Sequence, residues 1–115
     1  MYKEIEQIRS FEEIEEILFK HSDDYYVIDQ GLKSLEHKNT VKRLGARYLI
    51  KKSILDYLDL GDDFNDIEIE NEESGKPVVS FQGIVEEKIK QKNIKNVQVS
   101  ISHSRNYVAT LVIIE

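Results

Sequence analysis

The closing stretch of the chain, "VQVSISHSRNYVATLVIIE", constrains the fold more than any other part of the sequence. Two runs rich in valine, isoleucine and leucine, as buried strands require, flank a short polar turn. Strands joined by so few residues pair antiparallel, so the stretch predicts a β-hairpin. Its turn region holds Ser102, His103, Ser104 and Arg105. Side chains and backbone amides can converge on a ligand there, although serines in turns also bond locally to the backbone.

The first half of the chain predicts two helices. Ser10 and Glu13 have the spacing of a capping box, which starts a helix that ends near His21. The residues before Ser10 alternate only weakly, and they fit either a short strand or an irregular lead-in. A longer helix is expected from residue 39 or 40 to residue 58, with Gly61 as its C-terminal signal. Its apolar stripe consists of Val41, Leu44, Tyr48, Leu55 and Leu58.

The remaining segments predict strands and one more helix. The stretch "DDYYVIDQG" reads as a strand that ends in a turn, and "FNDIEIENEESGKPVVSF" reads as two strands around a turn at Gly75 and Pro77. The stretch "GIVEEKIKQKN" fits a short amphipathic helix. Strands grouped late in the chain and mixed with helices predict an α+β fold, in which an antiparallel sheet packs against the long helix. We expect a single domain over residues 1–115.

Composition narrows the function classes. The net charge of −6 argues against nucleic-acid binding through a basic surface, but it allows a local pocket with two or three cations. The longest apolar run is too short to cross a bilayer, and the N-terminus lacks the pattern of a signal peptide. The chain has no cysteine, which excludes disulfides and thiolate sites and favours a reducing cytoplasm.

Two further motifs carry positive charge. Arg43, Arg47 and Lys51 are four residues apart, so they stack along one stripe of the long helix, where each pair repels by a few tenths of a kcal/mol. A bound anion would offset that repulsion, but such a stripe is more often an ordinary solvated face. In "ESGKP" the flanking Gly75 and Pro77 hold Lys76 in a defined turn, a pattern that is weak when taken alone.

The three motifs in this order resemble the 4′-phosphopantetheinyl transferases. In length and ending, the chain is most similar to the small holo-acyl-carrier-protein synthase branch. The stretches "DIEIENEESGKPVVSF" and "VQVSISHSRNYVATLVIIE" match the second half of that branch, and "RLGARYLIKKSI" matches its central helix in part. The likeness covers residues 42–115. It implies a single-domain fold of that type and transfer of the phosphopantetheine arm of coenzyme A to a serine of an acyl carrier protein.

The resemblance also implies roles for particular residues. It implies that Lys51 and His103 act in catalysis. The residues that it implies in coenzyme A binding are Arg47, Lys51, Lys76, Pro77, Ser102, His103 and Ser104. Known small members of the family are trimers with active sites between subunits, so a homo-oligomer is expected.

The sequence departs from the family pattern at the metal site. The family uses a divalent ion, usually Mg²⁺, held by an aspartate near the N-terminus and a glutamate on the central helix. Here residues 1–10 contain no aspartate, and Lys52 takes the place of the glutamate. Because Mg²⁺ requires hard oxygen ligands, its binding is doubtful in this chain. Lys52 and Asp56 have the spacing of a helical ion pair.

Three outcomes are open at this site. Asp29 or Asp56 could supply substitute oxygens, Lys52 could neutralise the pyrophosphate without a metal, or the fold could have been kept while the reaction was lost. The alternative function is therefore a non-catalytic relative that binds coenzyme A or an acyl carrier protein. A scaffold that shares only the fold is the third interpretation.

Overall fold

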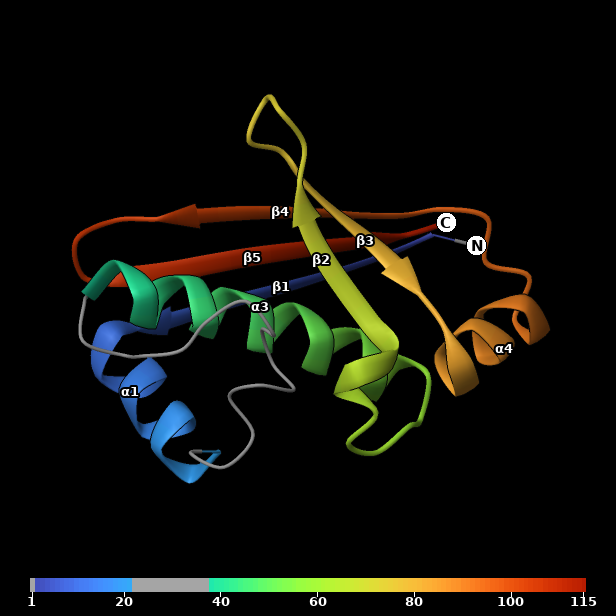
Figure 1. The fold of residues 1–115 in the computed structure, drawn as a ribbon, viewed down its shortest axis with the longest axis horizontal. Coiled ribbons are helices and arrows are strands. Elements are labelled where there is room, and N and C mark those ends of the chain that lie inside the picture. The colour runs from blue at the N-terminus through green and yellow to red at the C-terminus, as the bar shows by residue number, and fades with distance from the viewer. Residues whose placement is uncertain (1, 22–37) are drawn as a thin grey trace.

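The computed structural model describes residues 2–21 and 38–115, and it has the α+β architecture that the sequence predicts (Figure 1). Its strands are β1 (Lys3–Ser10), β2 (Ile67–Asn71), β3 (Pro77–Phe81), β4 (Val97–His103) and β5 (Tyr107–Ile114). Its helices are α1 (Phe11–Lys20), α3 (Lys38–Tyr57), the 3₁₀ turn η2 (Phe64–Asp66) and α4 (Gly83–Gln91). The strand expected in "DDYYVIDQG", together with Asp29, lies outside the described residues.

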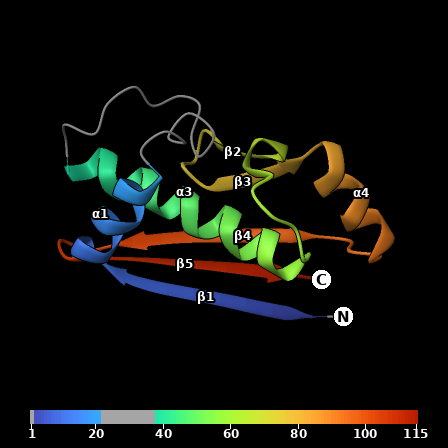
Figure 2. The same cartoon turned by 90° about the horizontal axis from the view of Figure 1, so that it is seen from below.

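The strands form two separate antiparallel sheets. One has the order β1-β5-β4, and the other is the β2–β3 hairpin. β1 pairs with β5 along its whole length, from Lys3 opposite Ile114 to Ser10 opposite Tyr107, so the N-terminal segment is a strand rather than an irregular lead-in. In Figure 2 the three-stranded sheet forms one layer, and α1, α3, the β2–β3 hairpin and α4 lie to the same side of it.

The capping box at the start of α1 is confirmed. The Ser10 Oγ accepts a hydrogen bond from the Glu13 backbone N–H at 3.1 Å, and the Glu13 carboxylate accepts one from the Ser10 N–H at 3.0 Å. The backbone hydrogen bond from Ser10 lowers the pKa of the Glu13 carboxyl, because it stabilises the charged form. Gly45 lets α1 approach α3 closely, since a Cβ there would lie 2.5 Å from the Ile14 Cγ2.

The long helix α3 is buried on more of its circumference than one amphipathic stripe would require. Leu49, Ile50 and Ile54 are buried in addition to the predicted face, because the sheet and α1 pack against different sides of the helix. The helix ends within one residue of the predicted end, but the expectation that Gly61 is its C-terminal signal was wrong. Asp59 adopts the left-handed conformation (φ 57°), and the N–H of Leu60 donates to the carbonyl of Leu55 at 2.9 Å. Aspartate is among the few residues that tolerate this conformation.

In the described part of the chain, no helix is both long enough and apolar enough to cross a bilayer.

Candidate active site

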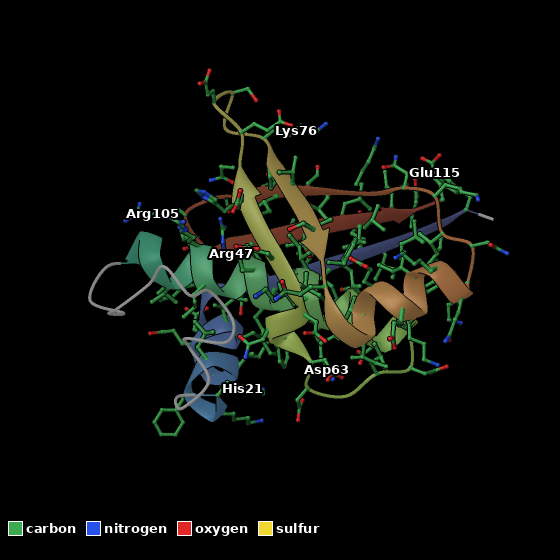
Figure 3. The ribbon with its side chains drawn as sticks, turned by 45° about the vertical axis from the view of Figure 1, so that its right-hand side comes forward. His21, Arg47, Asp63, Lys76, Arg105 and Glu115 are labelled. Atoms are coloured by element: carbon green, nitrogen blue, oxygen red, sulfur yellow. The ribbon has the colours of Figure 1, made fainter. Side chains whose placement is uncertain are left out.

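A cleft of about 440 Å³ opens between α3, the β2–β3 hairpin and the end of β4. It brings together residues from all three sequence motifs: Arg47 from the helix, Gly75 and Pro77 from the hairpin turn, and His103 from the last hairpin. The described residues that line it are Lys42, Arg43, Ala46, Arg47, Asn71, Gly75, Pro77, Ile101 and His103. Figure 3 shows Arg47 on α3 and Lys76 at the tip of the hairpin.

The basic stripe on α3 is not an ordinary solvated face. Arg47 and Lys51 are each only 4% exposed, and Arg43 alone of the three is exposed. Removing a cation from water is costly unless hydrogen bonds or an opposite charge compensate. The solvated interpretation therefore fails for Arg47 and Lys51. Of these two, Arg47 lines the cleft and Lys51 does not.

His103 is the last residue of β4 and pairs with Val108 of β5. Alternation along the strand puts its side chain on the same face as Ile101, which also lines the cleft. The His103 side chain is exposed, so a ligand in the cleft can reach it. Ser102 points to the opposite face of the sheet by the same alternation, and it is exposed there.

Ser104 builds the turn that follows His103. Its N–H donates to the carbonyl of Tyr107 at 2.9 Å, and its Oγ accepts from the N–H of Asn106 at 3.4 Å. These are the local backbone bonds that serine commonly makes in turns. Neither Ser102 nor Ser104 is among the residues that line the cleft, so their part in coenzyme A binding stays a prediction.

The Gly-Lys-Pro turn has the expected geometry. Gly75 adopts a φ of +90°, which glycine takes without strain, and its N–H donates to the carbonyl of Glu72 at 2.8 Å. The N–H of Glu72 in turn donates to the carbonyl of Lys76 at 2.9 Å. The Lys76 side chain is exposed, and it does not line the cleft as Gly75 and Pro77 do.

Sequence reasoning missed Lys42 and Asn71, which both line the cleft. Lys42 is 6% exposed, and its Nζ donates to the backbone carbonyl of Ser104 at 2.6 Å. Lys42 does not belong to the series of cations at four-residue spacing that includes Arg43 and Arg47. No local pattern marks it, because its partner is 62 positions away in the sequence.

The ion pair expected between Lys52 and Asp56, where the family carries its metal-binding glutamate, is present. The Lys52 Nζ lies 3.1 Å from the Asp56 Oδ1, and the hydrogen bond with Asp56 raises the pKa of Lys52. Lys52 comes five residues after Arg47, which places it about 140° around the helix, and neither Lys52 nor Asp56 lines the cleft. Within residues 2–21 and 38–115, no group of three or more histidine, aspartate or glutamate side chains could hold a metal ion.

The residues present therefore do not fit the Mg²⁺ site of the family. An ammonium stands where a carboxylate ligand is expected, and the nearby Asp56 carboxylate is engaged by that ammonium. The other candidate ligand, Asp29, lies outside the described residues.

No family model matches the chain, but individual proteins do. The holo-[acyl-carrier-protein] synthase of Vibrio atlanticus is 31% identical over 94 residues, which cover 82% of this chain and 74% of that protein. This chain belongs to the holo-[acyl-carrier-protein] synthase family. The enzyme of the same name from Halothermothrix orenii is 32% identical over 78 residues, and the chain spans only 62% of its length.

Solved structures of holo-[acyl-carrier-protein] synthases share the fold. The Plasmodium yoelii protein has a TM-score of 0.76 at 20% identity, covering 99% of this chain and 96% of that one. The Helicobacter pylori protein, solved in complex with coenzyme A, has a TM-score of 0.65 at 19% identity, covering 98% of this chain and 100% of that one. The family and the fold class predicted from the sequence are thereby confirmed.

Proposed function

We propose that this chain transfers the 4′-phosphopantetheine arm of coenzyme A to a serine of an acyl carrier protein. The observation that carries the proposal is that Arg47 of α3 and His103 of β4 line the same cleft. Membership of the holo-[acyl-carrier-protein] synthase family supports the same reaction, and so does the coenzyme A complex of the Helicobacter pylori relative.

The reaction makes clear demands on the cleft. The serine oxygen forms a bond to the β-phosphorus of coenzyme A, and the bond from that phosphorus to the bridging oxygen breaks. Adenosine 3′,5′-bisphosphate leaves with the bridging electron pair, and the serine hydroxyl gives up its proton. Such transfers are accelerated mainly by positioning and by neutralising the charge on the phosphates.

Arg47 and His103 meet these demands in the proposed mechanism. The planar guanidinium of Arg47 presents several donors in a fixed fork that suits phosphate oxygens. Its low exposure strengthens each bond, because little water competes there. In this mechanism the His103 imidazole contacts a phosphate and accepts the serine proton.

The other predicted residues have supporting roles. Lys51 adds positive charge one turn beyond Arg47. Pro77 lines the cleft on the hairpin side, and Lys76 precedes it in the same turn. Ser104 closes the turn after His103, Ser102 precedes His103 in β4, and both serines are proposed to shape the pocket. These cations give a negatively charged protein the local positive field that a nucleotide requires. No step is assigned to a metal ion, because the donor set around Lys52 does not fit one.

We also propose that the chain works as a homo-oligomer, with a trimer as the expected size. The face of the three-stranded sheet that points away from α3 is covered by no described helix (Figure 2). Ile8 and Tyr107 on that face are 53% and 54% exposed. Leu111 and Ile113 are only partly buried there, and apolar surface of this kind often marks an interface. Analytical ultracentrifugation tests the proposal, and a monomer at micromolar concentration would contradict it.

A cytoplasmic location stays a prediction from the cysteine-free composition.

Mass spectrometry of an apo acyl carrier protein tests the transfer directly. After incubation with coenzyme A and this chain, the carrier should gain one phosphopantetheine group, and it should gain far less with the His103→Ala variant. Binding of coenzyme A without transfer would favour the non-catalytic alternative. If the chain neither binds coenzyme A nor transfers its phosphopantetheine arm, both proposed functions are overturned.

A further inference from the structure

We propose that Lys42 is a positioning residue that holds the turn carrying His103 against α3. This inference rests on the proposed function, because it concerns the same cleft. It assigns a role to a residue that neither the basic stripe nor the Ser-His-Ser motif includes.

The first support is the burial of Lys42. The residue as a whole is 6% exposed, and the hydrogen bond that its ammonium makes is partly buried. A buried ammonium is tolerated only where hydrogen bonds replace those to solvent. The described bond is to the backbone carbonyl of Ser104 at 2.6 Å, and charge-assisted bonds of this length are among the stronger ones in proteins.

The second support is the position of the accepting carbonyl. Ser104 directly follows His103, so a bond to its carbonyl restrains the end of the strand that carries the imidazole. The bond links the first half of α3 to the β4–β5 turn. The same turn is also tied to the start of α1, because the N–H of Phe11 donates to the carbonyl of Asn106 at 2.8 Å.

The third support is that Lys42 and His103 line the same cleft. A shift of the turn away from α3 would therefore move the imidazole away from Arg47, and the two groups would no longer meet one phosphate. A displacement of this kind is costly for phosphoryl transfer, because the reaction depends on positioning.

Lys42 could instead bind a phosphate itself, since its ammonium lies at the same cleft. The two roles differ in how the Lys42 substitution combines with loss of His103. A residue that acts through His103 has little left to contribute once His103 is gone. A residue that binds phosphate independently loses the same factor in either background.

A double-mutant cycle decides between the roles. We would measure kcat/KM for coenzyme A, with apo carrier saturating, for wild type, Lys42→Met, His103→Ala and the double variant. Lys42→Met keeps the apolar stem and removes the donor, and we expect a loss of about tenfold or more. The double variant should fall within about twofold of His103→Ala alone.

Arg43→Met is the matched control, because it removes an exposed cation from the same cleft and leaves the Lys42–Ser104 bond in place. The factor by which Arg43→Met lowers kcat/KM should be the same with His103 present and with His103→Ala. Thermal melts establish that each variant is folded, and Lys42→Gln replaces Lys42→Met in the cycle if the latter does not fold. If the double variant loses kcat/KM by the product of the two single-variant factors, the positioning role of Lys42 is overturned. Absence of transfer by wild type would instead overturn the proposed function.

Discussion

Replacing Arg47 by methionine should weaken coenzyme A binding strongly, because this residue lines the cleft and is only 4% exposed. A hydrogen bond to a charged group contributes about 1.5–3 kcal/mol when its partner is desolvated. At about 1.4 kcal/mol per factor of ten, the dissociation constant should rise between about 10-fold and 150-fold. An exposed ion pair contributes at most about 1 kcal/mol, which is roughly fivefold. Isothermal titration calorimetry with coenzyme A separates these two ranges.

Arg105→Met is the matched control for this measurement. Arg105 has the same charge and lies two residues after His103, but it is exposed and does not line the cleft. Its removal should change the dissociation constant by no more than about threefold. Arg47→Lys, which keeps the charge and loses the planar fork, should lie between Arg47→Met and wild type. Equal binding by wild type and a folded Arg47→Met variant would refute the reasoning.

Three further predictions concern the metal site and the stability of the fold. The rate of phosphopantetheine transfer should differ by less than about threefold between assays with EDTA and assays with Mg²⁺, because the residues present do not offer the oxygen ligands that Mg²⁺ requires. Strong activation by magnesium would contradict this and reveal substitute ligands. Gly45→Ala should lower the melting temperature by several degrees, because the added Cβ would lie 2.5 Å from the Ile14 Cγ2. Gly61→Ala is the control and should leave the melting temperature unchanged, because no atom lies within 4 Å of the added Cβ. An unchanged melting temperature for Gly45→Ala would contradict this packing. The pKa of Glu13 is lower in the folded chain than in the unfolded chain, so ionised Glu13 stabilises the fold at pH values above its unfolded pKa. This stabilisation is lost as the pH falls through the folded pKa of Glu13. Melts of wild type and Glu13→Gln should therefore converge as the pH falls below the ordinary glutamate pKa of about 4.3, and a gap that widens there would disprove the assignment.

Features set by neighbouring residues could be predicted from the sequence. The capping box needs only Ser10 and Glu13, and the Lys52–Asp56 pair needs only one turn of helix. The opposite orientations of Ser102 and His103 follow from strand alternation, and they could have been predicted as well.

Features set by packing could not be predicted in this way. The burial of Arg47 and Lys51 depends on the elements that pack around α3, and no spacing within α3 reports it. The bond from Lys42 to Ser104 joins residues 62 positions apart. The C-terminal signal of α3 was assigned to the wrong residue because Asp59 and Gly61 can both adopt the left-handed conformation, and the chain uses the first of them.

A crystal structure of the chain with coenzyme A bound is the most direct test of whether Arg47 and His103 form one phosphate site. We expect phosphate oxygens within about 3.2 Å of both the guanidinium of Arg47 and a ring nitrogen of His103. A nucleotide bound elsewhere, with neither side chain in contact with a phosphate, would contradict the proposed active site.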